Sequence, residues 1–355
     1  MHTHSLWAPE AITSFLPAYV ANGVTGLRDM GGSLAILRAV HDSLRHRGSL
    51  LPRLFAAGAI LDGPKPVDPS ISIAVANAAD AQSAVDSVIA AGADFVKVYT
   101  LLPRDAYFAA VAAAAKAGRT VVGHIPFGVG VTDAVRAGQK SIEHLNDELE
   151  PYCTKARPAP CDSLIPLFLR YGTWQTPTLA AIRMKRFAVD TGSESDVRLA
   201  RIPASLRASW LTERRQKLAR GPAYAAANQA RFADEMWLVG HLHSAGVRLL
   251  AGSDAGIAFV FPGFSLHDEL ELLVAAGLTP VEALRAATLS AAQFMNATDS
   301  LGTIAVGKSA DLVLLRSNPL VAISATRDIE AVVLRGRLLR RETLDSLLQF
   351  AAHTK

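Results

Sequence analysis

Histidine and aspartate side chains close several short apolar runs of this sequence. His124 ends the run Thr-Val-Val-Gly-His, His144 ends Ser-Ile-Glu-His, and Asp254 ends Val-Arg-Leu-Leu-Ala-Gly-Ser-Asp. His2 and His4 are spaced i, i+2, and on a strand that spacing turns both imidazoles to the same side. Imidazole nitrogens and carboxylate oxygens are the ligands of zinc-class ions, so these five groups predict a metal site if their strand ends meet.

Each of these residues alone is weak support, because a single histidine is more often a satisfied core or loop residue than a ligand. A second His-x-His pair, His241 and His243, illustrates the point. It lies in a stretch, 232–245, that the pattern predicts to be helical, where positions i and i+2 point in different directions. We therefore assign this second pair to the surface and base the prediction on the combined set.

Lys97 lies in an otherwise apolar strand, Ala-Asp-Phe-Val-Lys-Val-Tyr. A bare ammonium inside a barrel is costly unless it is paired or neutralised. Two interpretations follow: Lys97 pairs with Asp254 or another acid, or its amine has reacted with CO2 to give a carbamate that bridges two metal ions. Tyr99 shares the same face of this strand, where it either hydrogen-bonds a developing oxyanion or packs.

The elements that would position these residues alternate between short strands and Ala/Leu-rich helices. With a first strand that ends at His4, the count of strands is eight, which predicts a (β/α)8 TIM barrel of the α/β class, with its active site at the carboxyl ends of the strands. The other seven predicted strands are 24–30, 53–58, 93–99, 120–125, 141–145, 173–179 and 247–254. We expect the barrel to occupy residues 1–300, with a C-terminal β-sandwich remnant and tail over 301–355.

Composition narrows the function. The chain has 355 residues, of which 50% are hydrophobic and 19% charged, and this excludes a disordered chain. The longest apolar run, 107–115, is far shorter than the roughly 20 residues of a membrane span. The net charge is +4 and the basic residues are scattered, so we expect no nucleic-acid partner.

Cys153 and Cys161 pair in an oxidising compartment or stay as thiols. We expect a cytoplasmic protein for the chain as given, or an exported one if an upstream signal segment is missing, and a homo-oligomer stays open.

Two segments need separate interpretation. Residues 180–240 predict a long, helix-rich connection over the barrel mouth, and the cluster Arg214, Arg215, Lys217 and Arg220 predicts a solvated helix face. Residues 302–309 match the spacing of a phosphate-binding loop, Gly-x4-Gly-Lys-Ser. That loop requires a helix after it, whereas the residues that follow predict a strand, so we do not expect nucleotide binding.

The sequence resembles the metal-dependent amidohydrolase superfamily, in its imidazolonepropionase-like and prolidase-like branch. The matching segments are His-Thr-His at 2–4, Val-Thr-Gly-Leu-Arg-Asp-Met at 24–30, Asp-Phe-Val-Lys-Val-Tyr at 94–99, Gly-His at 123–124, Ser-Ile-Glu-His at 141–144, Gly-Ser-Asp at 252–254 and the stretch 302–315. Members of that superfamily carry an N-terminal sandwich portion before the His-x-His pair. The resemblance therefore implies a sandwich module that is N-terminally incomplete here.

The resemblance also implies roles. His2, His4 and Asp254 would bind one divalent ion, and His124 and His144 a second. Carboxylated Lys97 would bridge the two ions, opposite a hydroxide, and Asp254 would pass a proton to the leaving amine. Zinc is the metal expected first, although Mn, Co and Fe suit the same donors. Two neighbouring residues are predicted to be structural: Arg28 in an ion pair with Asp29, and His267 at a helix start.

The implied activity is a binuclear, metal-dependent hydrolysis of amide-type carbon–nitrogen bonds. A small-molecule amide, such as an acyl-amino acid or a dipeptide-like compound, is the expected substrate. Two alternatives are kept: a cyclic-amide hydrolase of the imidazolonepropionase kind, and a non-catalytic binding protein on a truncated barrel.

Overall fold

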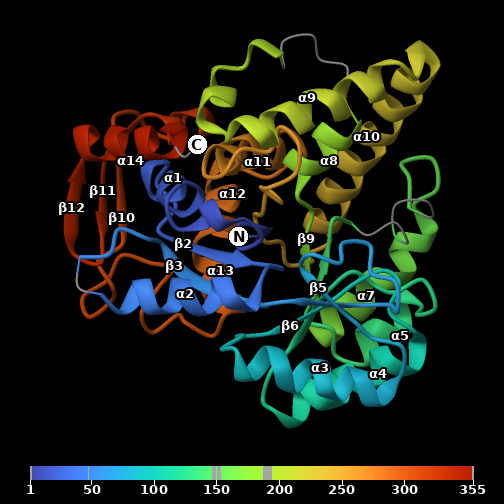
Figure 1. The fold of residues 1–355 in the computed structure, drawn as a ribbon. Coiled ribbons are helices and arrows are strands. Elements are labelled where there is room, and N and C mark those ends of the chain that lie inside the picture. The colour runs from blue at the N-terminus through green and yellow to red at the C-terminus, as the bar shows by residue number, and fades with distance from the viewer. Residues whose placement is uncertain (1, 47, 146–148, 150–152, 187–193, 354–355) are drawn as a thin grey trace.

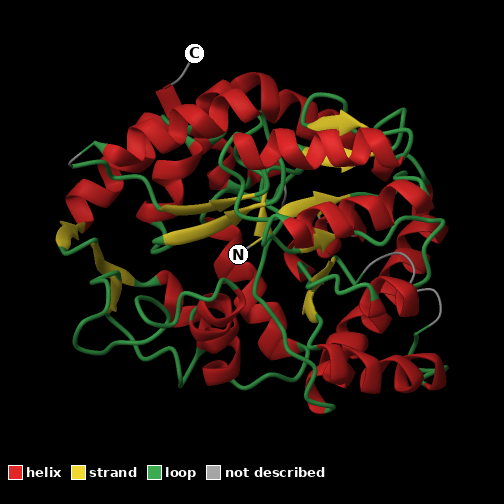
Figure 2. Ribbon diagram, turned by 90° about the horizontal axis from the view of Figure 1, so that it is seen from below, coloured by secondary structure: helices red, strands yellow, loops and turns green. Residues whose placement is uncertain are grey.

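The computed structural model describes residues 2–46, 48–145, 149, 153–186 and 194–353. Short parallel strands form its centre, with helices around them (Figures 1 and 2). One sheet contains β1 (His2–Thr3), β2 (Gly26–Asp29) and β3 (Arg53–Ala56) in that order. A second sheet has the order β5-β4-β6-β7-β8-β9. Its strands are β4 (Ile60–Asp62), β5 (Ser72–Ala74), β6 (Val96–Val98), β7 (Val121–Gly123), β8 (Ser141–Glu143) and β9 (Trp174–Thr176).

Backbone contacts join the two sheets into a closed barrel. The Asp94 N–H, just before β6, donates to the Ala56 carbonyl at the end of β3. On the other side, Gln175 of β9 forms a parallel bridge with Leu249, and Thr3 of β1 forms one with Ala255. Residues 247–254 therefore take the eighth position between β9 and β1. They were predicted as a strand, and the structure places them there as extended chain with bridges rather than a regular strand.

The helices cover the barrel because each presents an apolar face to the strands. In α3, for example, Ala81, Ala84, Val85 and Val88 are buried, while Asn77 caps the helix by accepting from the Ala79 and Asp80 N–H groups. The helices are α1 (Phe15–Ala21), α2 (Leu34–Arg45), α3 (Ala78–Ala90), α4 (Arg104–Lys116), α5 (Val131–Arg136), α7 (Ala159–Tyr171), α8 (Leu179–Arg186), α9 (Ala204–Leu218), α10 (Gly221–Ser244), α11 (Phe264–Ala275), α12 (Pro280–Ala287), α13 (Leu289–Phe294) and α14 (Arg341–His353). Among the described residues, 3-10 helices span Pro9–Ala11, Val197–Arg201 and Ile323–Arg327.

A three-stranded antiparallel sheet follows the barrel in sequence. It consists of β10 (Leu312–Leu315), β11 (Ile329–Leu334) and β12 (Arg337–Arg340), and it lies beside α1 and α14 (Figure 1). Buried residues of β11 and β12, such as Val332 and Leu339, share a core with Val20 of α1 and Leu344 of α14. The predicted division between residues 300 and 301 stays a prediction.

The connection at 180–240 is helical in its described part, from α8 through α9 and α10, while residues 187–193 of that region lie outside the described residues. The predicted solvated face is wrong for one member: Arg214 is buried, with its Nη1 2.6 Å from Glu194 Oε1. No helix follows residues 302–309, where the next element is β10. Within the part of the chain that the structure describes, no helix is both long and apolar enough to span a membrane.

Candidate functional site

The six predicted ligand residues come from five of the eight positions of the barrel, near the carboxyl ends of its strands. His2 and His4 come from β1 and the residue after it, and Lys97 from β6. His124 and His144 directly follow β7 and β8, and Asp254 ends the eighth segment. Parallel strands of one barrel end at the same rim, which is why side chains so far apart in sequence meet.

His2, His4 and Asp254 form the tightest group. Asp254 Oδ1 lies 3.1 Å from His2 Nε2 and 3.4 Å from His4 Nε2. One ligand-type atom from each of the three residues lies within 4.8 Å of the other two. The sequence predicted this trio as the ligands of one ion, and the structure brings it together.

His124 and His144 lie beside this trio. The ring centroids of His124 and His144 are 4.9 Å apart, and those of His2 and His144 are 4.5 Å apart. The other carboxylate oxygen of Asp254, Oδ2, lies 3.9 Å from His144 Nδ1. The two predicted pairs of histidines therefore form one continuous cluster around Asp254.

Each of the four histidines forms a hydrogen bond through its Nδ1 atom, which we call its anchor. The Nε2 atom takes no part in that hydrogen bond. The Nδ1 partners are a Glu143 carboxylate oxygen for His2 (2.6 Å), the Gly31 carbonyl for His4 (3.1 Å), the Thr100 hydroxyl for His124 (2.9 Å) and the Thr178 hydroxyl for His144 (2.7 Å). Such partners fix the ring orientation and the tautomer of a metal-binding histidine. An anchor at Nδ1 leaves Nε2 as the ring atom that a metal ion would bind.

The backbone at the rim is held in an unusual conformation. His144, its partner Thr178, and Asp254 have φ angles of 64°, 52° and 57°. The left-handed region costs a non-glycine residue about 1–3 kcal/mol and occurs preferentially at functional sites. Three such residues within one cluster indicate that the fold imposes the positions of these side chains.

Burial favours the neutral form of His4, His124 and His144, which is the form that binds metals. Desolvation lowers the pKa of His4 to about 4 and moves the pKa values of His124 and His144 well below the usual range. Burial also opposes ionisation of Asp254, but the neighbouring His144 and Lys185 outweigh it and hold the pKa of Asp254 well below its usual range. Neutral imidazoles and an ionised carboxylate are thus present together at neutral pH.

Buried polar atoms without a hydrogen-bond partner supply a test of whether a metal fits. Among the described residues, His124 Nε2 and Lys97 Nζ are such atoms. Of the two interpretations of Lys97, the pairing with Asp254 or another acid is therefore not found, because no carboxylate of the described residues lies within ion-pair distance of this buried amine. Desolvation lowers the pKa of Lys97 to about 8. The buried, unpartnered Nε2 of His124, whose other ring nitrogen is bonded to Thr100, fits a ligand of a cation.

The sequence interpretation missed Glu143. It is fully buried in β8, one residue before His144, and holds both His2 and Arg28. An acidic residue inside an apolar strand was the signal that could have found it. The predicted pair of Arg28 with Asp29 is wrong: Arg28 Nη2 lies 3.0 Å from Glu143 Oε2, since Arg28 points into the barrel while Asp29 accepts from the Ser5 N–H outside it.

The structure also shows where Tyr99 and the remaining histidines of the sequence analysis lie. The Tyr99 ring lies 4.1 Å from that of His124, and Lys97 Nζ is 5.7 Å from the Tyr99 ring, so Tyr99 shares the Lys97 face as expected. His267 is buried in α11 between Thr326 and the Asn22 carbonyl, a structural position. His241 and His243 lie on α10, with Asp162 and Glu282 as ion-pair partners, away from the cluster.

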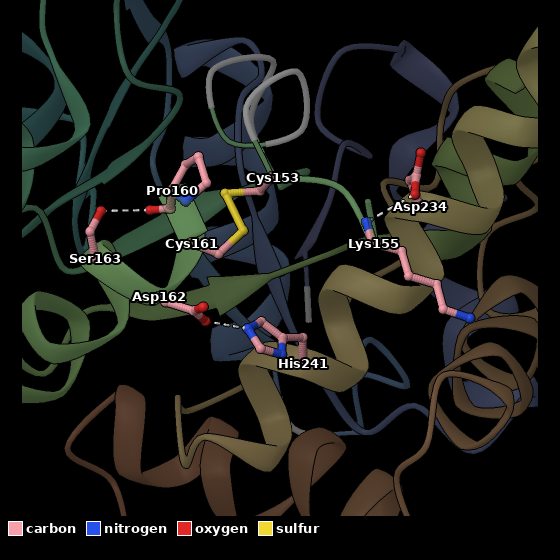
Figure 3. Close-up of a disulfide and its surroundings, with 8 residues drawn as sticks. All are labelled: Cys153, Lys155, Pro160, Cys161, Asp162, Ser163, Asp234 and His241. Atoms are coloured by element: carbon pink, nitrogen blue, oxygen red, sulfur yellow. Dashed lines mark hydrogen bonds and ion pairs between the residues drawn. A yellow bond between two sulfur atoms is a disulfide. The ribbon is translucent and has the colours of Figure 1, made fainter. Parts of the chain in front are cut away.

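The two cysteines, left open above, form a disulfide between Cys153 and Cys161 (Figure 3). It joins Cys153, in the connection that follows His144, to Cys161 in the first turn of α7. Contacts on both sides of it bind this segment to α10: the Lys155 N–H donates to Asp234, and His241 bonds Asp162 (Figure 3).

Comparisons with known proteins agree with this geometry. A search of curated proteins finds no match. Among solved structures, bottromycin amidohydrolase has a TM-score of 0.78 and 29% identity, over 95% of this chain and 76% of that chain. A putative prolidase from Bifidobacterium longum has a TM-score of 0.72 and 25% identity, over 99% of this chain and 83% of that chain. A Xaa-Pro dipeptidase with bound methionine has 0.70 and 21%, over 96% and 85%.

The family model described as "Amidohydrolase family" matches residues 7–339, nearly the whole chain. Its match covers the strands that carry Lys97, His124, His144 and Asp254. This chain therefore belongs to the amidohydrolase family, whose members are hydrolases that act on carbon–nitrogen bonds and generally use divalent metal ions.

Proposed function

We propose that the protein is a binuclear metal-dependent hydrolase that cleaves the amide bond of acyl-amino acids or dipeptide-like compounds. The observation that carries the proposal is the anchoring of four imidazoles through Nδ1 around one ionised aspartate. A surface or packing role does not need this matched arrangement, whereas a metal site does.

His2, His4 and Asp254 would hold one ion, because their ligand atoms already lie together. His124 and His144 would hold the second. Carboxylated Lys97 would bridge the two, and two features support this role: the amine is buried without a partner, and its lowered pKa leaves part of it unprotonated, the form that reacts with CO2. Zinc suits a mixture of imidazole and carboxylate ligands.

When bound, a pair of such cations lowers the pKa of water and polarises a carbonyl. The chain's own groups supply the rest of the chemistry. Asp254 has one oxygen toward His2 and His4 and the other toward the rim, where it can accept a proton from attacking water and return it to the leaving amine. Tyr99, on the Lys97 side, is placed to donate its hydroxyl to the carbonyl oxygen as charge develops there.

The peptide-like substrate class is supported by the nature of the similar proteins, which include a Xaa-Pro dipeptidase and a putative prolidase. A panel of dipeptides, N-acyl-amino acids and cyclic ureides tests it directly. If the cyclic ureides were cleaved faster than every linear amide, the protein would instead be a cyclic-amide hydrolase.

Metal content and one substitution test the mechanism. We expect two zinc-class ions per chain, and we expect Asp254→Asn to lower kcat at least about a hundredfold because it removes the proton acceptor. Arg183→Met, an exposed change on α8, is the control and should keep wild-type kcat. Less than one ion per chain, or an Asp254→Asn variant as active as the wild type, would refute the mechanism.

A further inference from the structure

Lys185 places a cation at the mouth of the site that the proposed mechanism does not use. It lies on α8, which begins directly after Thr178, the partner of His144. Its Nζ is 3.5 Å from Asp254 Oδ2, and its side chain is 48% exposed whereas that of Asp254 is 5% exposed. The side chain therefore spans from solvent to the edge of the buried cluster.

The charge of Lys185 acts on the whole cluster. It helps to lower the pKa values of His124, His144 and Lys97, as well as that of Asp254. The ammonium thus lies above the centre of the site rather than beside one member of it. A substrate group that reaches Asp254 Oδ2 from solvent therefore comes close to this cation.

The next arginine along α8 does not offer the same charge. Arg186 is paired with the buried Glu235, with 2.6 Å between Nη2 and Oε1. Lys185 is different, because its carboxylate partner in the described chain is Asp254, which the proposed mechanism assigns to a metal ion. If Asp254 bound a divalent cation, its negative charge would be largely neutralised and would no longer balance the Lys185 ammonium. The metal ions would also repel this ammonium.

We infer that Lys185 is a specificity-determining residue that binds the free carboxylate of the amino acid released by hydrolysis. This inference rests on the proposed function, since it assigns the part of the substrate that lies outside the scissile amide. A carboxylate supplies the missing counter-charge, and a half-exposed lysine on a flexible stem reaches it at low cost. Substrates that end in a carboxamide lack this contact and should be selected against.

The experiment compares two probes, glycyl-L-leucine and glycyl-L-leucinamide, with the metal-loaded wild type and the Lys185→Met, Lys185→Arg and Arg183→Met variants. We expect Lys185→Met to raise KM for the carboxylate probe about tenfold, the amount of one charged hydrogen bond at a partly exposed position. For the carboxamide probe kcat and KM should change less than about twofold. Lys185→Arg should restore most of the preference, and Arg183→Met should leave it unchanged.

A loss of equal size for both probes, or a loss in kcat alone, would overturn the inference, because Lys185 would then act through Asp254. If the wild type cleaves neither these probes nor any linear amide of the panel above, the proposed function fails, and a binding measurement decides the role of Lys185. Calorimetric titration with N-acetyl-L-leucine and with N-acetyl-L-leucinamide serves this purpose. Tighter binding of the acid that disappears in Lys185→Met supports the inference, and equal binding by both proteins refutes it.

Discussion

At the scale of single residues, the charge at the centre of the barrel depends on Glu143. Burial disfavours its ionised form, but Arg28 and His2 outweigh this effect and hold its pKa well below the usual range. Its two oxygens are shared between the Arg28 guanidinium and His2 Nδ1. Glu143 therefore fixes the tautomer of a metal-ligand candidate and at the same time neutralises a buried cation.

Glu143→Gln should expose both roles, because it keeps the shape of the side chain and removes its charge. Arg28 would remain buried without an anion, and we expect the free energy of unfolding to fall by about 3 kcal/mol. Zinc affinity should fall roughly tenfold as His2 loses its charged partner. Urea unfolding and zinc titration against a competing chelator measure the two effects. Glu330→Gln, which breaks an exposed pair with Arg316, is the control and should cost less than about 1 kcal/mol.

At the scale of elements, β7 needs glycine at its last position. Gly123 has a φ of 128°, and a Cβ there would lie 2.2 Å from the Val98 carbonyl oxygen and 2.9 Å from Lys97 Cδ. The close approach of β7 to β6 is what brings His124 beside Lys97. A side chain at this position would push the two strands apart at the site itself.

We predict that Gly123→Ala destabilises the protein by about 4 kcal/mol or more and weakens metal binding, since backbone atoms of β6 must move. Gly118→Ala is a matched control: its φ is 67°, and nothing lies within 4 Å of the added methyl group. It should cost only about 1 kcal/mol of backbone strain. Equal unfolding midpoints in urea for the two variants would show that β7 and β6 tolerate separation.

Glu269 links α11 to the start of α8, the helix that carries Lys185. Its carboxylate accepts from the Ala180 N–H at 2.7 Å, and burial raises its pKa to about 8. Between the ordinary pKa of 4.5 and this value, the folded protein keeps a proton that the unfolded chain releases. The contribution of Glu269 to stability is therefore complete below pH 4.5 and is lost as the pH rises through 8.

Glu269→Gln does not titrate, so its stability relative to the wild type should increase with pH between 5 and 8, by at most about 1.4 kcal/mol per pH unit. Urea unfolding of both proteins at several pH values in this range gives the comparison. A stability difference that stays constant with pH would mean that the carboxyl group ionises in its ordinary range within the fold.

The barrel and its rim could be predicted because hydrophobic alternation marks strands, and polar residues at their ends must share one edge. This logic located His124, His144 and Asp254 from sequence alone. It could not identify the partner of Arg28, because Glu143 lies across the barrel, and which interior side chains meet depends on the barrel's registration. It also missed the role of Lys185, since the direction of α8 after β9 is set by packing on α10 and α11.

At the scale of the whole molecule, the site lies across the seam where the barrel closes. The two residues of β1 lie between β2 and the eighth segment. That segment meets the start of the chain through the bridge of Thr3 with Ala255 and through backbone hydrogen bonds of His2 and His4. His2 and His4 contact Asp254 across this seam. An ion held by these three residues would add side-chain ligation to the backbone hydrogen bonds that join the first and last positions of the barrel.

Metal binding should therefore stabilise the entire fold. At a free zinc concentration 100 times Kd the expected gain is about 2.7 kcal/mol, which raises Tm by several degrees, and a chelator should reverse it. Scanning calorimetry can compare the wild type with a His2→Ala/His4→Ala variant and a His241→Ala/His243→Ala variant. Each variant loses one His-x-His pair, the first at the seam of the barrel and the second on α10. The zinc-dependent rise should vanish in the first variant and persist in the second. A zinc-dependent rise in Tm of equal size in all three proteins would show that the stabilising ion binds elsewhere and does not join the first and last positions of the barrel.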